Sequence, residues 1–77
     1  MAGIDDKVGG ALDITRRDWT GLPWDVDPNG CRDQDWVRVL PGTYYLEKIE
    51  SGWVYIRLGG TMVKLDEGDM RAHWPNA

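Results

Sequence analysis

SGWVYIRLGGTMVKL, residues Ser51 to Leu65, is the stretch of sequence that determines the fold. Its first half alternates between aliphatic and other side chains, which is the two-residue period of a β-strand with one buried face. The residues predicted to face the core are Val54, Ile56 and Leu58, and those predicted to face outward are Trp53, Tyr55 and Arg57.

Two glycines divide the stretch into two strands. Gly59 and Gly60 can both take the positive φ angles that a two-residue hairpin turn requires. The residues TMVKL follow the turn, and the same alternation places Val63 and Leu65 on the buried face. The sequence therefore predicts an antiparallel hairpin.

Further strands are predicted on both sides of this hairpin. WVRVL (36–40) and TYYLEKIE (43–50) are rich in β-branched and aromatic residues, and the PG and SG pairs that follow them favour turns. MRAHWP (70–75) is expected to add a fifth short strand or one helical turn that closes the end of the barrel with Met70 and Trp74. The fold predicted for residues 37–77 is all-β, an antiparallel meander of four to five strands that curls into a small open barrel.

The run from Ser51 to Leu65 resembles the central hairpin of bacterial SH3-like domains, in which a Gly-Trp pair opens a strand of alternating aliphatic residues. The resemblance covers residues 51–65 only. It implies a small SH3-like barrel that acts as a binding module for peptides or cell-wall strands.

Residues 1–36 have a different composition. They contain eight of the thirteen acidic residues, only four basic ones, five glycines and two prolines, and their aliphatic residues follow no sustained period. We expect them to form a mostly irregular, acidic N-terminal arm that contains glycine and tryptophan. The predicted division is thus an arm over 1–36 and a barrel domain over 37–77.

The totals restrict the classes of function. The chain has 77 residues, which is one small domain, and its net charge of −4 lacks the basic footprint of a nucleic-acid-binding protein. No apolar stretch approaches the length of about 20 residues that spans a membrane, and the first residues do not have the pattern of a signal peptide. With Cys31 as the one cysteine, no internal disulfide is expected. We expect a protein of the cytoplasm or of a virus particle.

Residues with catalytic potential are few. His73 lies near the tail beside Trp74, and Cys31 follows a turn with no base nearby in the sequence. We therefore expect no catalytic residues, no enzymatic activity and no cofactor.

The segment DVDPNGCRD, residues 25–33, has part of the pattern of a calcium loop. Oxygen-bearing residues occupy positions 1, 3, 5 and 9 and a glycine occupies position 6, but Trp36 stands where the loop requires a bidentate Glu. A proline at position 4 also favours an ordinary turn. We expect a turn and no metal site, with a weak candidate set that consists of Asp25, Asp27, Asn29 and Asp33.

Aromatic residues provide the strongest indication of function. Five tryptophans and three tyrosines occur in the chain, and Trp, Tyr and Arg are the residue types most enriched at binding hot spots. The residues predicted to bind a partner are Trp53, Tyr55, Arg57, Trp19 and Trp24. In the alternative interpretation the arm folds back to cap the barrel, and Trp19 or Leu22 packs against Trp53.

These observations favour a non-enzymatic interaction protein that binds a protein partner or assembles with itself, and that binds neither nucleic acid nor membrane. The first hypothesis is a small viral or phage structural accessory of the capsid-decorating or connector type, which binds through its arm and its aromatic strand face. The alternative is a small phage-encoded inhibitor or adaptor that blocks a host protein complex. A weak calcium-binding module is the third.

Overall fold

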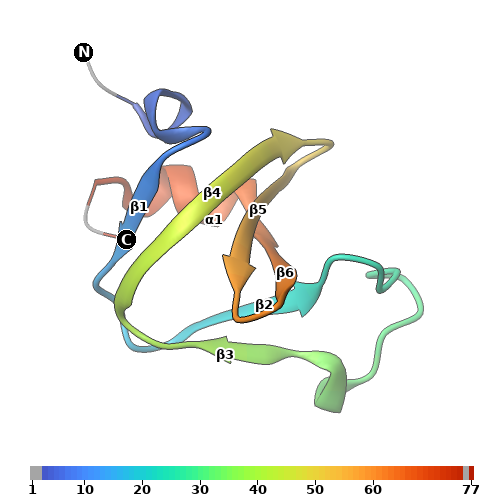
Figure 1. The fold of residues 1–77 in the computed structure, drawn as a ribbon. Coiled ribbons are helices and arrows are strands. Elements are labelled where there is room, and N and C mark those ends of the chain that lie inside the picture. The colour runs from blue at the N-terminus through green and yellow to red at the C-terminus, as the bar shows by residue number, and fades with distance from the viewer. Residues whose placement is uncertain (1–2, 76) are drawn as a thin grey trace.

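The chain folds into one curled sheet of six antiparallel strands with a short helix at its end (Figure 1). The computed structural model describes residues 3–75 and 77. The strands are β1 (Ala11–Ile14), β2 (Trp19–Pro23), β3 (Val37–Val39), β4 (Gly42–Glu50), β5 (Trp53–Leu58) and β6 (Thr61–Asp66). The helices are the 3-10 turns η1 (Ile4–Lys7) and η2 (Asp33–Asp35) and the α-helix α1 (Glu67–His73).

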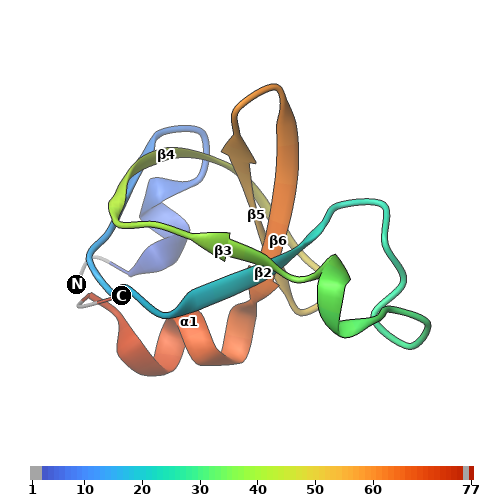
Figure 2. The same cartoon turned by 90° about the horizontal axis from the view of Figure 1, so that it is seen from below.

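The strand order in the sheet is β1-β4-β5-β6-β2-β3. β4, β5 and β6 form three strands of the predicted meander, but β3, its predicted first strand, pairs with β2 and not with β4. β1 adds to the outer side of β4, and β2 adds to the outer side of β6. Because β3 runs on into β4 and pairs with β2, the sheet curls round on itself like a barrel (Figure 2). The prediction of an all-β, small, barrel-like fold is confirmed.

Both predicted turns are hairpin turns, and of the two glycines expected to take positive φ in the second turn, Gly59 does and Gly60 does not. The β4–β5 loop consists of Ser51 and Gly52, with φ angles of 55° and 85°. The β5–β6 loop consists of Gly59, with a φ of 66°, and Gly60. Positive φ matches the turn to the twist of the strands, which fixes the register of each pair.

The core lies inside the curled sheet. Val54 and Ile56 of β5 are fully buried, and Leu58 packs against the core from a partly buried position, so the predicted phase of this strand is confirmed. Of the two alternatives for the last segment, the helical one is observed: α1 inserts Met70 into the core, and Trp74 packs against it. Helix α1 thus closes the barrel on one side (Figure 2).

The expectation of a mostly irregular arm over residues 1–36 requires a correction. The described part of this segment contains β1 and β2, which raises the strand count from the expected four or five to six. Its fully or nearly fully buried side chains are Ile4, Leu12, Ile14, Trp19 and Leu22. The two strands have only four and five residues, and their hydrogen-bond partners lie far along the chain in β4 and β6. A local pattern does not reveal such pairing.

Candidate protein-binding surface

The outer surface of β5 carries the strip that the sequence predicted. Cross-strand partners share a face, so Tyr55 lies on the same side of the sheet as its partner Lys64 in β6. Trp53 and Tyr55 are half-buried, and the side chain of Arg57 is 63% exposed. The alternation of β5 therefore places all three side chains on the outside of the barrel.

Lysine side chains from the neighbouring strands stand over the two aromatic rings of this strip. The Nζ of Lys64 lies 5.3 Å from the ring centroid of Trp53, and the Nζ of Lys48 lies 4.9 Å from that of Tyr55. Both distances allow a cation–π attraction. Lys64 is only 6% exposed, so the indole provides electrostatic compensation for a largely desolvated ammonium group.

Arg57 is held between two residues of β4. Its guanidinium forms a 2.6 Å ion pair with Glu47, and its Cζ lies 5.8 Å from the ring centroid of Tyr45. Tyr45 is itself 44% exposed. An exposed ion pair adds little stability, but the two contacts fix the position of the guanidinium on the surface.

Trp24 stands beside this strip, at the rim of an open groove of about 440 Å³. Its backbone N–H donates to the carbonyl of Met62 at 3.1 Å, which anchors it next to the β5–β6 hairpin. The side chain is 49% exposed. The groove is lined by Trp24, Glu47, Lys48, Arg57, Gly60, Thr61 and Met62. We call the surface formed by Trp24, Tyr45, Trp53, Tyr55 and Arg57 the aromatic face.

Trp19 lies elsewhere. It is 6% exposed, its indole N–H donates to the carbonyl oxygen of Ala77 at 3.2 Å, and the ring of His73 meets it edge-on at 5.7 Å. The structure thus brings four of the five predicted residues together and places Trp19 in the core. Leu22 is fully buried and pairs with Lys64, the lysine that stands over the ring of Trp53, so it lies on the same side of the sheet as that lysine.

No protein-family model, curated protein or solved structure matches this chain. Among the described residues, no helix is long and apolar enough to cross a membrane.

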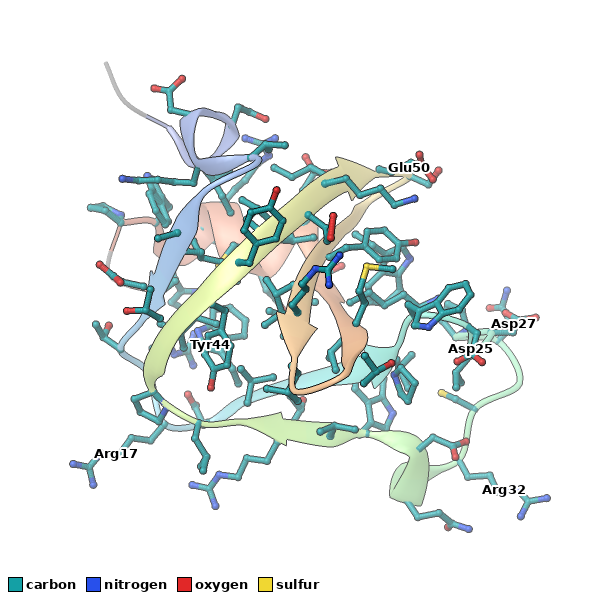
Figure 3. The ribbon with its side chains drawn as sticks, viewed as in Figure 1. Arg17, Asp25, Asp27, Arg32, Tyr44 and Glu50 are labelled. Carbon is teal, nitrogen blue, oxygen red and sulfur yellow. The ribbon has the colours of Figure 1, made fainter. Side chains whose placement is uncertain are left out.

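The weak calcium candidates lie on the loop between β2 and β3, at the periphery of the molecule, where Figure 3 labels Asp25 and Asp27. The Oδ1 of Asp27 accepts the backbone N–H of Asn29 at 3.0 Å, and its carbonyl accepts that of Gly30 at 3.0 Å. Asp33 begins η2. The bond to the side chain of Asp27 is that of an Asx turn, and the bond to its carbonyl is that of a β-turn. In residues 3–75 and 77, no three His, Cys, Asp or Glu side chains gather as a metal site would require.

A second hollow, of about 300 Å³, lies on the side of the barrel next to α1. Its polar groups serve the fold. Arg16 forms a bidentate contact with Asp18, and the bonded guanidinium lowers the pKa of that carboxyl. Asp66 caps α1 by accepting the N–H of Asp69 at 2.9 Å, and the Nδ1 of His73 lies 2.9 Å from the carbonyl of Asp69. Cys31 does not line this hollow. Its thiol lies 3.3 Å from the carbonyl oxygen of Pro28, three residues earlier in the chain.

Sequence reasoning missed Tyr45, Lys48 and Met62. The position of Tyr45 on this face could be predicted, because it lies two residues from Glu47 on a predicted strand and the two side chains therefore share a face. Lys48 was not, because the register between β4 and β5 shifts between Leu46 and Lys48. Such an irregularity changes the phase of the side chains beyond it.

Proposed function

We propose that this protein is a non-enzymatic binding module that docks onto a partner protein through the aromatic face. The observation that carries the proposal is the groove whose rim combines Trp24, 49% exposed, with Arg57, whose side chain is 63% exposed. Exposed aromatic residues next to an arginine are the composition of binding hot spots. A partner would bury the indole and retain the charge of the guanidinium at the rim.

The positions of the side chains favour such binding. Arg57 is held by Glu47, and Lys48 stands over Tyr55. Side chains that are already held in place lose less conformational entropy when a partner binds. The partner surface that fits carries an apolar group for the Trp24 groove and an acceptor for Arg57.

In its biological form the module is proposed as a small structural accessory of a virus particle, of the capsid-decorating or connector type. The alternative is a phage-encoded inhibitor or adaptor of a host complex. Copy number separates the two: an accessory is present in purified particles in stoichiometric amounts, whereas an inhibitor is recovered with one host complex. The proposal involves no cofactor, nucleic acid or catalytic step, and it places the protein in the cytoplasm or in the particle.

The test compares Trp24→Ala with Val8→Ala, a substitution at another exposed apolar residue that does not line the groove. The tagged variants are used to recover partners from the source cells, and mass spectrometry identifies and quantifies each partner. The expected result is loss of the partner with Trp24→Ala alone, while both variants melt within a few degrees of the parent. Equal recovery with both variants, or a lowered melting temperature for Trp24→Ala, would refute a binding role for the groove.

A further inference from the structure

The strand β3 has one edge to which no other described strand is hydrogen-bonded. It is the last strand in the sheet order and pairs with β2 alone. In Figure 1 it is the lowest strand, and Figure 2, seen from below, shows nothing in front of it. An exposed row of backbone donors and acceptors is a template for a further strand.

The register identifies which backbone groups point to this free edge. Trp24 donates its N–H to β6, and the backbone groups of successive residues in a strand point to opposite sides, so Gly21, three residues earlier, points to β3. Gly21 faces Val37, and Val37 therefore directs its backbone groups back to β2. The N–H and C=O of Arg38, the next residue, point to the free side.

The edge is longer than the three residues of β3. Trp36 has extended backbone angles, φ −73° and ψ 130°, so its carbonyl continues the free row on the same phase as Arg38. At the other end, the hydroxyl of Tyr44 donates to the carbonyl of Leu40, which leaves the N–H of Leu40 as the last donor of the row. The free edge therefore extends over Trp36–Leu40.

The side chains along this edge have a distinct pattern. The side chains of Trp36, Arg38 and Leu40 lie on the face of β3 opposite to that of the buried Val39. Trp36 is 40% exposed and Leu40 is 58% exposed. Arg38 donates from Nε and Nη2 to the carbonyl of Arg17 at 3.1 and 2.9 Å, so its guanidinium lies next to the backbone of Arg17, and both residues are exposed. Figure 3 shows Arg17 directed away from the sheet. Neither arginine forms an ion pair with a described residue, although the whole chain has a net charge of −4.

We propose that the free edge of β3 binds an extended acidic segment of a partner protein as an added strand, with a carboxylate facing Arg38 and Arg17 and an apolar residue against Trp36 and another against Leu40. Main-chain bonds supply the affinity of this mode, and alternate side chains supply its specificity. Charge complementarity selects the occupant, because opposite charges on facing strands attract. A second copy of the chain fits less well, since pairing of all five residues in antiparallel order sets Arg38 directly against Arg38.

This inference goes beyond the aromatic face and does not depend on it. The probe is the capped peptide EVTETVE, which has the same sequence in both directions and so presupposes no strand orientation. Its matched control is KVTKTVK. Titration into the ¹⁵N-labelled full chain is followed by the amide resonances, and hydrogen exchange of the Arg38 amide is measured with and without the peptide.

Three results are expected. In the free protein the Arg38 amide exchanges at least tenfold faster than those of Val37 and Val39, because its N–H points to solvent. The acidic peptide shifts the amides of Trp36–Leu40 and slows exchange at Arg38. It binds about tenfold more tightly than the lysine peptide, a preference that weakens with salt and reverses in Arg38→Glu. Trp24→Ala leaves the binding unchanged.

Any of the following results would overturn the proposal. An Arg38 amide that is already protected in the free protein would mean that the edge is not free. Equal binding of both peptides would show that charge does not select the occupant. Shifts confined to the aromatic face would show that the peptide binds at another place. If Arg38→Glu melts well below the parent, Arg17→Glu provides the reversal test, since the side chain of Arg17 forms none of the described hydrogen bonds.

Discussion

Gly21 of β2 packs closely against β6, and a methyl group there should damage the fold. A Cβ at this position would overlap the Cγ1 of Val63 and would lie 2.9 Å from the carbonyl oxygen of Lys64 and 3.1 Å from the Cδ2 of Leu65. Val63 and Leu65 are buried, and the Lys64 oxygen belongs to the backbone of the paired strand β6. None of the three atoms can move away without disturbing the core or the sheet.

The magnitude follows from two opposing effects. Overpacking a core by one methyl group costs about 1–3 kcal/mol, and a backbone obstacle puts Gly21→Ala in the upper part of that range. Loss of glycine flexibility in the unfolded chain returns about 0.4–1 kcal/mol. We expect a net loss near 2 kcal/mol, which lowers the melting temperature of a domain of this size by about 10 °C.

Circular dichroism melts of matched variants provide the assay. Gly30→Ala is the control, because a Cβ there meets nothing within 4 Å, and it should melt at or slightly above the parent temperature. Val63→Ala removes the atom that the new methyl group would overlap. The double variant should therefore lose less stability than the sum of the losses of the two single variants. A Gly21→Ala protein that melts within about 2 °C of the parent would refute the close approach of β2 and β6.

Two further predictions concern pH and calcium. Arg71 donates two 3.0 Å hydrogen bonds to Asp5, which lower the pKa of this carboxyl below its ordinary 3.8. The stabilisation is therefore complete above pH 3.8 and is lost as the pH falls through the lowered value, so Asp5→Asn should flatten the acid limb of a melt-versus-pH curve while Asp6→Asn should not. An unchanged acid limb would contradict this. EDTA should leave the melting temperature unchanged, because the side chain of Asp27 is engaged in its turn; a fall of more than about 5 °C that calcium reverses would reveal a metal site.

The sequence predicts the part of this fold that local contacts determine. The hairpin from Trp53 to Asp66 and the burial of Val54 and Ile56 follow from alternation and from the turn residues between the strands. β2 escapes prediction because Gly21 and Pro23 are poor strand formers and its register is set by a distant strand. Tertiary pairing overrides local propensity there.

The candidate surface also has one part that the sequence predicts and one part that it does not. Period two is sufficient to place Trp53, Tyr55 and Arg57 on the outside. The position of Trp24 next to Arg57 depends on the pairing of β2 with β6, which the sequence does not encode locally. Tryptophan is a residue type typical of binding surfaces, yet the indole N–H of Trp19 donates to the carbonyl oxygen of Ala77. Because this internal bond satisfies the indole N–H, the side chain can be buried in the core.

The placement of β2 between β6 and β3 has a consequence for how the protein is made. As the chain emerges from the ribosome, Leu22 appears about 40 residues before its partner Lys64, and β1 likewise precedes its partner β4. β1 has no partner strand until β4 exists, and β2 can pair only with β3 until β6 exists, so the early segment stays incompletely paired while it is synthesised. The β4–β5 and β5–β6 hairpins, which each close across two residues, are the pairs that can form quickly. A pause in translation before Thr61 would therefore prolong the time during which β2 lacks its partner β6 and the side chain of Leu22 is exposed to aggregation.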